Sequence, residues 1–326
     1  MSFFSAANPA MDTGGFVDYP KSEVYQLIPP QYLPQTCFIK RGDLSLENVL
    51  AVMRLHELHF PVIFKPDRGE RGFGVAKLKQ EEDILNYIED YRHIDQRFIL
   101  QEYVDAPVEL GILYYRFPHE RIGNISSVVQ KELPQLIGNG KSTLEELIVS
   151  DQRAVLNLKL LKEKFQDRLH TVIPKDEVVP LVEIGNHCKG ATFLNANVLI
   201  NQKLIRVIDH ISWQIDGFYF GRFDLKVPNL HDLYAGRNIK IIELNGANSE
   251  PAHIYDPNMP LFRAYYDLFR HWQRLYEVSV ANHRRGIGYM PFAQLLKKLV
   301  MHQKLRNSLK DNSRKQRLPT GNINKS

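Results

Sequence analysis

Apolar and polar positions follow two different spacings along the chain, and together these predict a mixture of helices and strands. Helical spacing is found at residues 44–59, 80–92 and 260–281, with Ser45 as the N-cap of the first segment. Residues 142–147 contain two overlapping capping boxes and predict another helix start, and residues 292–306 predict a basic helix. Short apolar or alternating runs predict strands at 60–65, 75–78, 97–103, 108–117, 122–131, 204–208, 218–227 and 238–244. We therefore expect an α+β fold whose sheet strands come from two lobes.

The composition suits a globular protein of about two domains. The chain has 326 residues, of which 44% are hydrophobic and 24% are charged. Its net charge of +5 comes from the C-terminus: residues 296–326 hold nine Lys or Arg and one acid, so residues 1–295 carry −3. A nucleic-acid-binding module needs basic residues interleaved with aromatics across the body, so no nucleic-acid partner is expected. We expect a solvated, partly disordered tail, with electrostatic adhesion to an anionic membrane or to nucleic acid as the alternative for the tail alone.

The cysteine content and the absence of a long apolar run indicate a cytoplasmic protein. Cys37 and Cys188 are too few for a disulfide framework, and neither has a metal-ligand spacing. No apolar run approaches the ~18 residues that a membrane span needs. The N-terminus also lacks a basic segment followed by an apolar one, so no secretory signal is visible.

The most informative stretch is a glycine-rich turn between two predicted strands. Gly69, Gly72 and Gly74 allow close backbone approach, so successive amides can point at one anion. Lys65, at the end of the first strand, adds a point charge for a phosphate oxygen. A hairpin that only turns the chain is the alternative interpretation.

A second group of residues suits a metal ion. Glu243 and Asn245 are two apart in a predicted strand, so their side chains share one face. Asp224 on a neighbouring strand completes a set of oxygen ligands of the kind that magnesium prefers. A solvated strand face with alternating polarity is the alternative, but a phosphate-binding loop nearby strengthens the metal interpretation.

Together these residues resemble the ATP-grasp superfamily of carboxylate–amine ligases, which includes D-alanine–D-alanine ligase. The similarity runs from about Tyr19 to Pro257 and implies the ATP-grasp fold, in which two α+β lobes sandwich the nucleotide. Most such ligases begin with a further N-terminal domain, which is strongly shortened here. The resemblance divides the chain into a vestigial N-terminal segment at 1–43, a lobe with the glycine-rich loop and hinge at 44–131, a lobe with the metal site at 132–290 and the basic tail at 291–326.

The resemblance also assigns roles to individual residues. It implies nucleotide binding by the two lysines, the glycine loop, a hinge strand, a ribose-binding acid and an additional phosphate lysine: Lys21, Lys65, Gly69, Gly72, Gly74, Gln101, Glu102, Tyr103, Val104, Glu109 and Lys189. It implies metal binding by Asp224, Glu243 and Asn245, and catalytic roles for Arg222 and Lys65. Lys40 is the rival of Lys21, but it lies too close to Lys65.

The implied activity is an ATP-dependent ligation. The γ-phosphoryl group of ATP passes to a carboxylate, and an amine attacks the acyl phosphate to form an amide or peptide bond. Two Mg²⁺ ions are implied, with Mn²⁺ as an alternative, and the partners are a small-molecule carboxylate and amine, with a dimer favoured. The competing hypothesis is a catalytically inactive nucleotide-binding regulatory protein of the same fold. The complete set of metal-ligand types argues against it.

Three further stretches have open interpretations. The block at residues 4–9, with Gly14, Gly15 and Phe16, resembles a remnant of the missing domain that lines the substrate site, or it is a plain N-terminal strand. Residues 249–257 follow the metal strand and are expected to line the acceptor pocket, with a rigid turn as the alternative. His187 is a candidate base for the amine, with a surface or hydrogen-bonded histidine as the favoured alternative.

Overall fold

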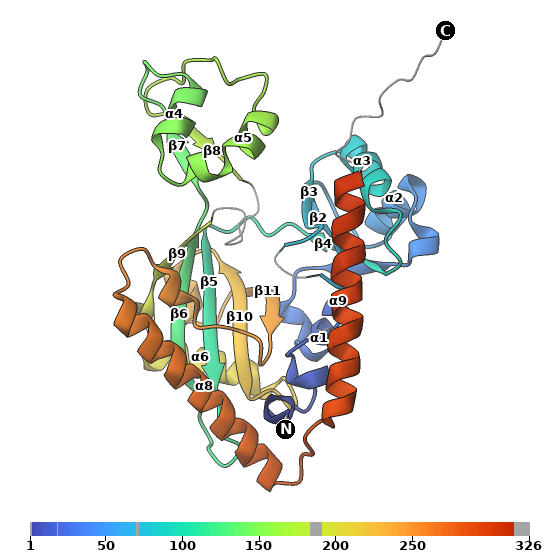
Figure 1. Cartoon of the computed structure of the whole chain (residues 1–326), viewed down its shortest axis with the longest axis vertical. Helices are drawn as coiled ribbons and strands as arrows, with labels where there is room; N and C mark the ends of the chain where they lie inside the picture. The colour runs from blue at the N-terminus through green and yellow to red at the C-terminus, as the bar shows by residue number, and fades with distance from the viewer. Residues whose placement is uncertain (1, 18, 70–71, 183–190, 316–326) are drawn as a thin grey trace.

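Two lobes, each an α+β unit with its own sheet, make up most of the molecule (Figure 1). The computed structural model describes residues 2–17, 19–69, 72–182 and 191–315. The prediction of an α+β fold with two lobes is confirmed, because a four-stranded and a five-stranded sheet have separate cores. Among the described residues, no helix has both the length and the apolar character that crossing a membrane requires.

The N-terminal lobe is an antiparallel sheet covered by two helices. Its strand order is β1-β4-β2-β3, formed by β1 (Thr36–Ile39), β2 (Val62–Pro66), β3 (Ala76–Leu78) and β4 (Phe98–Glu102). The covering helices are α2 (Leu46–Leu55) and α3 (Glu81–Tyr91), preceded by the 3-10 turn η4 (Arg41–Asp43). The predicted N-cap is confirmed, since the Ser45 hydroxyl accepts a hydrogen bond from the Asn48 backbone at 3.2 Å.

The C-terminal lobe has a five-stranded antiparallel sheet of order β11-β10-β5-β6-β9. Its strands are β5 (Val108–Tyr115), β6 (Asn124–Glu132), β9 (Thr192–Asn195), β10 (Phe220–Val227) and β11 (Lys240–Asn245). One face packs on α6 (Gln202–Trp213) and α7 (Leu230–Tyr234), and the other packs on α8 (Leu261–Arg284). The 3-10 turns η7 (Asn197–Leu199) and η8 (Ala252–Tyr255) complete the lobe.

A small unit is inserted between β6 and β9 and has a core of its own. It contains β7 (Gln135–Ile137), α4 (Leu144–Ser150), η5 (Ala154–Asn157), α5 (Leu158–Lys164) and β8 (Val178–Pro180). Its two strands pair only with each other among the described strands, and it stands above the C-terminal lobe in Figure 1. The helix start predicted at 142–147 is confirmed: Thr143 and Glu146 form a reciprocal capping box.

Two sequence predictions are corrected by the sheet and helix pairing. Residues 204–208, predicted as a strand, lie in helix α6. Leu204, Ile208 and Ile211 recur at helical spacing and are buried, and the Asn201 side chain caps the helix. Strands β5 and β6 fall within the predicted lobe at 44–131, but β5 pairs with β10, so both belong to the C-terminal sheet.

The N-terminal segment does not form the plain strand that was one of its two interpretations. It folds into the 3-10 turns η1 (Phe3–Ala6) and η2 (Asp12–Gly14), followed by α1 (Lys21–Leu27) and η3 (Pro30–Tyr32). The Asn8 amide donates to the carbonyls of Gly14 and Phe220, so this segment is bonded to the start of β10. A side chain on Gly246 would meet the Gly14 carbonyl oxygen at 2.6 Å, and this close approach explains the glycine after β11.

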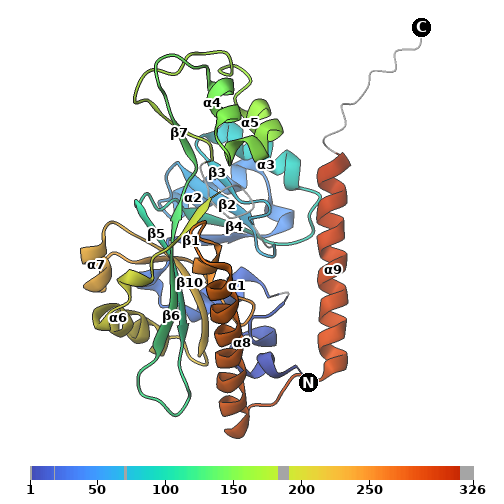
Figure 2. The same cartoon turned by 60° about the vertical axis from the view of Figure 1, so that its left-hand side comes forward.

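The C-terminal helix α9 (Phe292–Lys315) extends beyond the helix predicted at 292–306 and stands beside the body (Figure 2). A salt bridge between Lys298 and Asp12 connects it to the N-terminal segment. The part of the predicted tail beyond Lys315 lies outside the described residues.

Candidate nucleotide and metal site

The residues predicted to bind metal and phosphate lie on one face of the β10–β11 pair. Arg222 is opposite Asn245, and Asp224 is opposite Glu243. Alternate residues of a strand leave the same face, so these four side chains share it, whereas the intervening Phe223 belongs to the core. Directly opposite residues in antiparallel strands have Cβ atoms about 5 Å apart. The register therefore brings the three predicted metal ligands together with Arg222.

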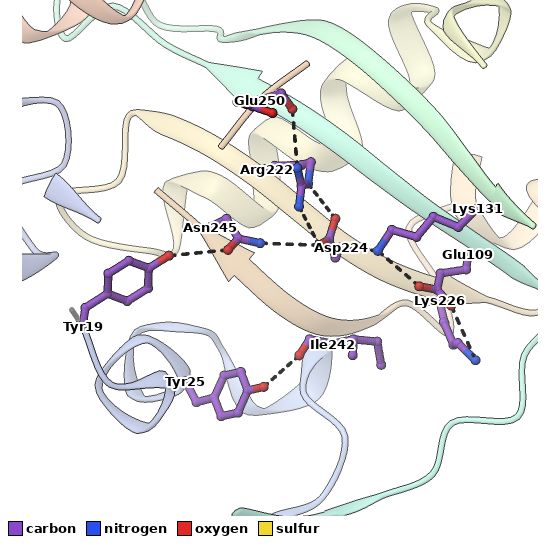
Figure 3. A network of polar contacts seen from close by, with 10 residues as sticks. All are labelled: Tyr19, Tyr25, Glu109, Lys131, Arg222, Asp224, Lys226, Ile242, Asn245 and Glu250. Carbon is purple, nitrogen blue, oxygen red and sulfur yellow. Dashed lines mark hydrogen bonds and ion pairs between the residues drawn. The ribbon is translucent and has the colours of Figure 1, made fainter. Parts of the chain in front are cut away.

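Asp224 is the centre of the polar network on this face (Figure 3). Arg222 donates from Nε to Oδ1 at 2.8 Å and from Nη2 to Oδ2 at 3.1 Å. The Lys131 Nζ lies 3.5 Å from Oδ2, and the Asn245 amide donates to the same oxygen at 3.4 Å. Burial acts to raise the pKa of Asp224, but Arg222 and Lys131 outweigh it and hold this pKa below its usual value. Asp224 is therefore an ionised carboxylate.

Lys131 is a site residue that the sequence reasoning missed. Its Nζ lies 3.2 Å from Glu109 Oε1, so it bridges Glu109 and Asp224. Burial acts to lower the pKa of Lys131, but these two carboxylates raise it above its usual value. The signal in the sequence is only a lysine at the end of the strand predicted at 122–131. Glu109, predicted to bind ribose, also lies 3.8 Å from Lys226 Nζ.

Lys65 connects the two lobes through Tyr25. Its buried ammonium donates to Tyr25 Oη and to Gln101 Oε1, both at 2.8 Å. Tyr25 Oη in turn donates to the carbonyl of Ile242, the residue before Glu243, at 2.8 Å. Burial lowers the pKa of Lys65 to about 7, and Glu243 partly opposes this effect. The lysine of the N-terminal lobe is therefore linked to the strand of the C-terminal lobe that carries the predicted metal ligands Glu243 and Asn245.

The glycine loop is held against the start of α1. Gly69, Gly72 and Gly74 all have positive φ, and a Cβ on Gly74 would lie 2.7 Å from the Pro66 ring. Lys21 Nζ donates to the Gly69 carbonyl at 2.5 Å, so the structure brings this predicted lysine to the loop.

Asp67 anchors this arrangement and was not predicted. Its carboxylate accepts from the backbone N of Ser22 at 2.8 Å and from the Ser22 hydroxyl at 2.7 Å. Arg97 lies 3.3 Å from the same carboxylate. The position of Lys21 therefore depends on a buried acid at the entrance of the loop.

The hinge residues have side-chain contacts within the protein. Gln101 contacts Lys65, and Glu102 accepts from the Gln35 backbone N at 3.1 Å. The Tyr103 ring lies 3.6 Å from Lys77 Nζ, and the Val104 carbonyl accepts from Lys226 Nζ at 3.2 Å. The contact of this backbone with adenine stays a prediction.

The loop after β11 is fixed beside Arg222. Arg222 Nη1 lies 3.5 Å from the Glu250 carbonyl, which accepts its hydrogen bond. Farther along, the buried His253 lies 2.7 Å from Ser127 Oγ and 3.1 Å from Asp267, which joins the loop to β6 and α8. The role of residues 249–257 in an acceptor pocket stays a prediction.

A metal ion at this site would need ligands beyond the carboxylates. In the part of the chain that the structure describes, no three His, Cys, Asp or Glu side chains gather as a metal-binding cluster. The two opposed carboxylates and the Asn245 amide fit Mg²⁺, which commonly takes one or two carboxylates and completes its shell with water and phosphate oxygens. Lys189 and His187 lie outside the described residues.

Among curated proteins, one relative of the chain is a ligase of the kind that the sequence resembles. No protein-family model matches the chain. A curated D-alanine–D-alanine ligase from Prochlorococcus marinus (strain MIT 9515) is 27% identical over 121 residues, or 35% of this chain and 34% of that protein. The match thus spans about a third of the length of this curated relative.

Similar solved structures have low sequence identity to the chain. A bifunctional glutathione synthetase from Pasteurella multocida is 15% identical, with a TM-score of 0.41 over 77% of this chain and 36% of that one. The VanG D-Ala:D-Ser ligase from Enterococcus faecalis is 14% identical, with a TM-score of 0.46 over 81% of this chain and 61% of that one. A D-alanine–D-alanine ligase from Bacillus anthracis is 11% identical, with a TM-score of 0.41 over 82% of this chain and 67% of that one.

Proposed function

We propose that the chain is an Mg-ATP-dependent ligase that activates a carboxylate as an acyl phosphate and joins it to an amine. The observation that carries the proposal is the chain of contacts from Lys65 through Tyr25 to the carbonyl of Ile242. These contacts connect the buried Lys65 ammonium of the N-terminal lobe with the strand of the C-terminal lobe that carries Glu243 and Asn245. An anionic nucleotide with its metal ions suits a site with a cation on one side and carboxylates on the other.

The metal ligands in this proposal are Asp224, Glu243 and Asn245. Two carboxylates directly opposite each other repel, so this face needs positive charge between or beside them. In the structure Arg222 and Lys131 supply that charge to Asp224. Magnesium, when bound, would neutralise the phosphate charge during transfer.

The chain's own cations position and stabilise the phosphates. Lys65 and Lys21 bind phosphate oxygens from the N-terminal side, and the loop with Gly69, Gly72 and Gly74 closes over them and excludes water. Arg222 is placed to stabilise charge on the transferring group, because its guanidinium is held rigidly by both oxygens of Asp224. Lys131 joins this set from the opposite side of Asp224.

The remaining parts of the proposal concern ligands and setting. Two Mg²⁺ ions are proposed, with Mn²⁺ as a substitute, and the hinge residues Gln101–Val104 with Glu109 bind adenosine. The substrates are a small-molecule carboxylate and amine. We also propose a dimer in the cytoplasm, with the basic C-terminal segment able to contact an anionic membrane and no nucleic acid as partner.

An inactive regulatory nucleotide-binding protein is the competing proposal, and one experiment separates the two. ADP and phosphate release are measured with Mg-ATP against a panel of carboxylates and amines. A ligase gives release that requires both substrates, and Asp224→Asn abolishes it while Asp95→Asn, at an exposed carboxylate, does not. ATP binding without turnover across the panel would support the regulatory protein, and turnover unaffected by Asp224→Asn would refute the metal assignment.

A further inference from the structure

Helix α8 carries a stripe of exposed aromatic side chains on the side facing away from the sheet. They are Phe262, Tyr265, Tyr266, Phe269, Trp272 and Tyr276, and their spacing places them along one helix face. The opposite face, with Leu275 and Val278, is buried against the C-terminal sheet. Phe262 is 90% exposed and Phe269 is 67% exposed, which is unusual for side chains of this size. Figure 1 shows α8 crossing the outside of the lobe.

The second C-terminal helix also exposes apolar side chains. Phe292, Leu296, Leu299, Val300 and Met301 of α9 are all exposed. Figure 2 shows α9 standing beside the body rather than packed into it. Large apolar side chains are thus exposed on both helices, and such a gathering marks an interaction site.

The charge of these helices is opposite to that of the rest of the protein. Residues 261–315 contain twelve Lys or Arg and three Asp or Glu, a net charge of +9. Residues 1–260 contain 28 Lys or Arg and 34 Asp or Glu, a net charge of −6. Arg263, Arg270 and Arg274 follow one edge of the aromatic stripe, and Lys297 and Lys304 are exposed on α9. The apolar surface therefore has a basic border, so its occupant is expected to be anionic.

Three kinds of partner are candidates for binding at these helices, and the exposed side chains favour one of them. A second copy in a two-fold dimer would place these positively charged helices against their own copies, where like charges repel. Single-stranded nucleic acid binds through stacking on rings, which Leu296, Leu299 and Val300 do not offer. Aromatic and aliphatic side chains bordered by Lys and Arg suit the boundary between headgroups and acyl chains of an anionic bilayer.

We propose that α8 and α9 form a docking surface for an anionic phospholipid bilayer. The helices lie on the membrane with the aromatic stripe at the level of the headgroups. Their arginines and lysines contact lipid phosphates. The tail was the only membrane contact expected from the sequence, whereas this surface centres on α8, which belongs to the folded lobe. The proposal does not depend on ligase activity, and ATP binding measured in parallel reports separately on the nucleotide site.

Co-sedimentation of the full chain with lipid vesicles tests the apolar part of this proposal. We expect binding to phosphatidylglycerol vesicles, weak binding to phosphatidylcholine vesicles, and loss of binding as salt is raised. The double variant Phe262→Ser, Phe269→Ser is expected to bind at least about tenfold more weakly, because two exposed rings are lost. The matched control is Leu156→Ser with Val198→Ser, two apolar residues that are 81% and 90% exposed elsewhere on the molecule. Equal weakening by both pairs, or none by the phenylalanine pair, would overturn the proposal.

The charge requirement is tested by a second matched pair. Lys297→Glu with Lys304→Glu is expected to weaken binding to phosphatidylglycerol by about tenfold or more, since each lysine contributes about fivefold near an anionic surface. Lys175→Glu with Lys203→Glu makes the same change of net charge at exposed positions away from α8 and α9. If both double variants lost binding equally, only the net charge of the protein would matter, and this result would overturn the docking surface. Tight binding of a single-stranded RNA would assign the surface to RNA instead. A dimer that dissociates in the Phe262→Ser, Phe269→Ser variant would assign it to a second copy of the chain.

Discussion

The two halves of the candidate site compensate their charges in opposite ways. In the N-terminal half, the buried Lys65 ammonium has two neutral hydrogen-bond partners, Tyr25 and Gln101, and its pKa is lowered to about 7. In the C-terminal half, the buried Asp224 carboxylate is contacted by both Arg222 and Lys131, and its pKa is held below the usual value. One half therefore needs an anion to satisfy its lysine, whereas the other already has its counter-charges in place.

This difference predicts how the phosphates and the metal ions of a nucleotide would each interact with the site. Phosphate next to Lys65 adds the missing negative charge, so it stabilises the protonated lysine. A cation next to Asp224 competes with cations that the chain already provides. We therefore expect phosphate binding to depend on Lys65 through its charge, and metal binding to depend on how firmly Arg222 and Lys131 hold Asp224.

The largest expected effect is in the C-terminal half of the candidate site, where Asp224 already has two cationic partners. Arg222→Lys keeps the positive charge but loses the two parallel hydrogen bonds to Asp224. We expect the maximal rate of Mg-ATP turnover to fall by about a hundredfold or more, as for loss of a donor that stabilises transition-state charge. Arg237→Lys, at an exposed arginine paired with Asp232, is the control and should leave the rate unchanged. A similar rate for both variants would contradict the role of Arg222.

A smaller effect is expected when a side chain is added next to Asp224 in the same half of the site. A Cβ on Gly111 would lie 2.8 Å from Val129 Cγ1 and 3.1 Å from Asp224 Oδ1. Gly111→Ala should lower the free energy of unfolding by about 1–3 kcal/mol and weaken Mg-ATP binding, because the Arg222–Asp224 pair has to shift. Gly42→Ala is matched, since a Cβ there meets no atom within 4 Å. Urea unfolding measures both, and an unfolding free energy of Gly111→Ala equal to that of Gly42→Ala would refute the tight packing.

The half that needs an anion should respond to pH. The pKa of Lys65 is lowered to about 7, so most Lys65 is neutral at pH 8. In the proposed site, ATP binds the protonated form of this lysine. Binding at pH 8 should therefore take up close to one proton, and the affinity should fall by roughly tenfold per unit of pH above 7. Calorimetry in two buffers of different ionisation enthalpy measures this uptake. Lys65→Met should abolish it, and uptake that persists in this variant would exclude Lys65 as its source.

The smallest expected effect concerns the affinity for Mg²⁺ beside Asp224. Lys131→Gln removes one of the two cations on Asp224, so Mg²⁺ in the absence of nucleotide should bind a few-fold more tightly. Lys226→Gln is the control, because Lys226 lies near Glu109 but has no ion pair with Asp224 among the described contacts. Titration calorimetry with Mg²⁺ distinguishes the variants. Weaker Mg²⁺ binding in Lys131→Gln would mean that Lys131 positions Asp224 rather than competing for it.

The sequence predicted the contents of each strand better than the contacts between strands. Glu243 and Asn245 share a face because side chains alternate in any strand, and this follows from spacing alone. Lys131 joins Asp224 only because β5 pairs with both β6 and β10, which is a matter of long-range register. The contact of Tyr25 with Lys65 likewise depends on how α1 packs between the lobes.

The incorrect predictions have a common physical origin. Residues 204–208 form a short apolar run, and such a run fits a buried strand or a buried helix turn until its packing partners are known. Strands β5 and β6 follow β4 in the chain but hydrogen-bond to the other sheet, so sequence order misplaced the lobe boundary. Local spacing decides which residues share a face, whereas tertiary pairing decides which lobe a strand joins.

The central claim is that Lys65 of one lobe and Asp224 of the other act on the same Mg-ATP molecule. A double-mutant cycle on Mg-ATP affinity, with Lys65→Met, Asp224→Asn and the double variant, tests this most directly. If both residues act on one nucleotide, the two losses should be non-additive, with a coupling energy of about 1 kcal/mol or more. Losses that add within about 0.3 kcal/mol would mean that the two groups act independently, and this would contradict the shared site.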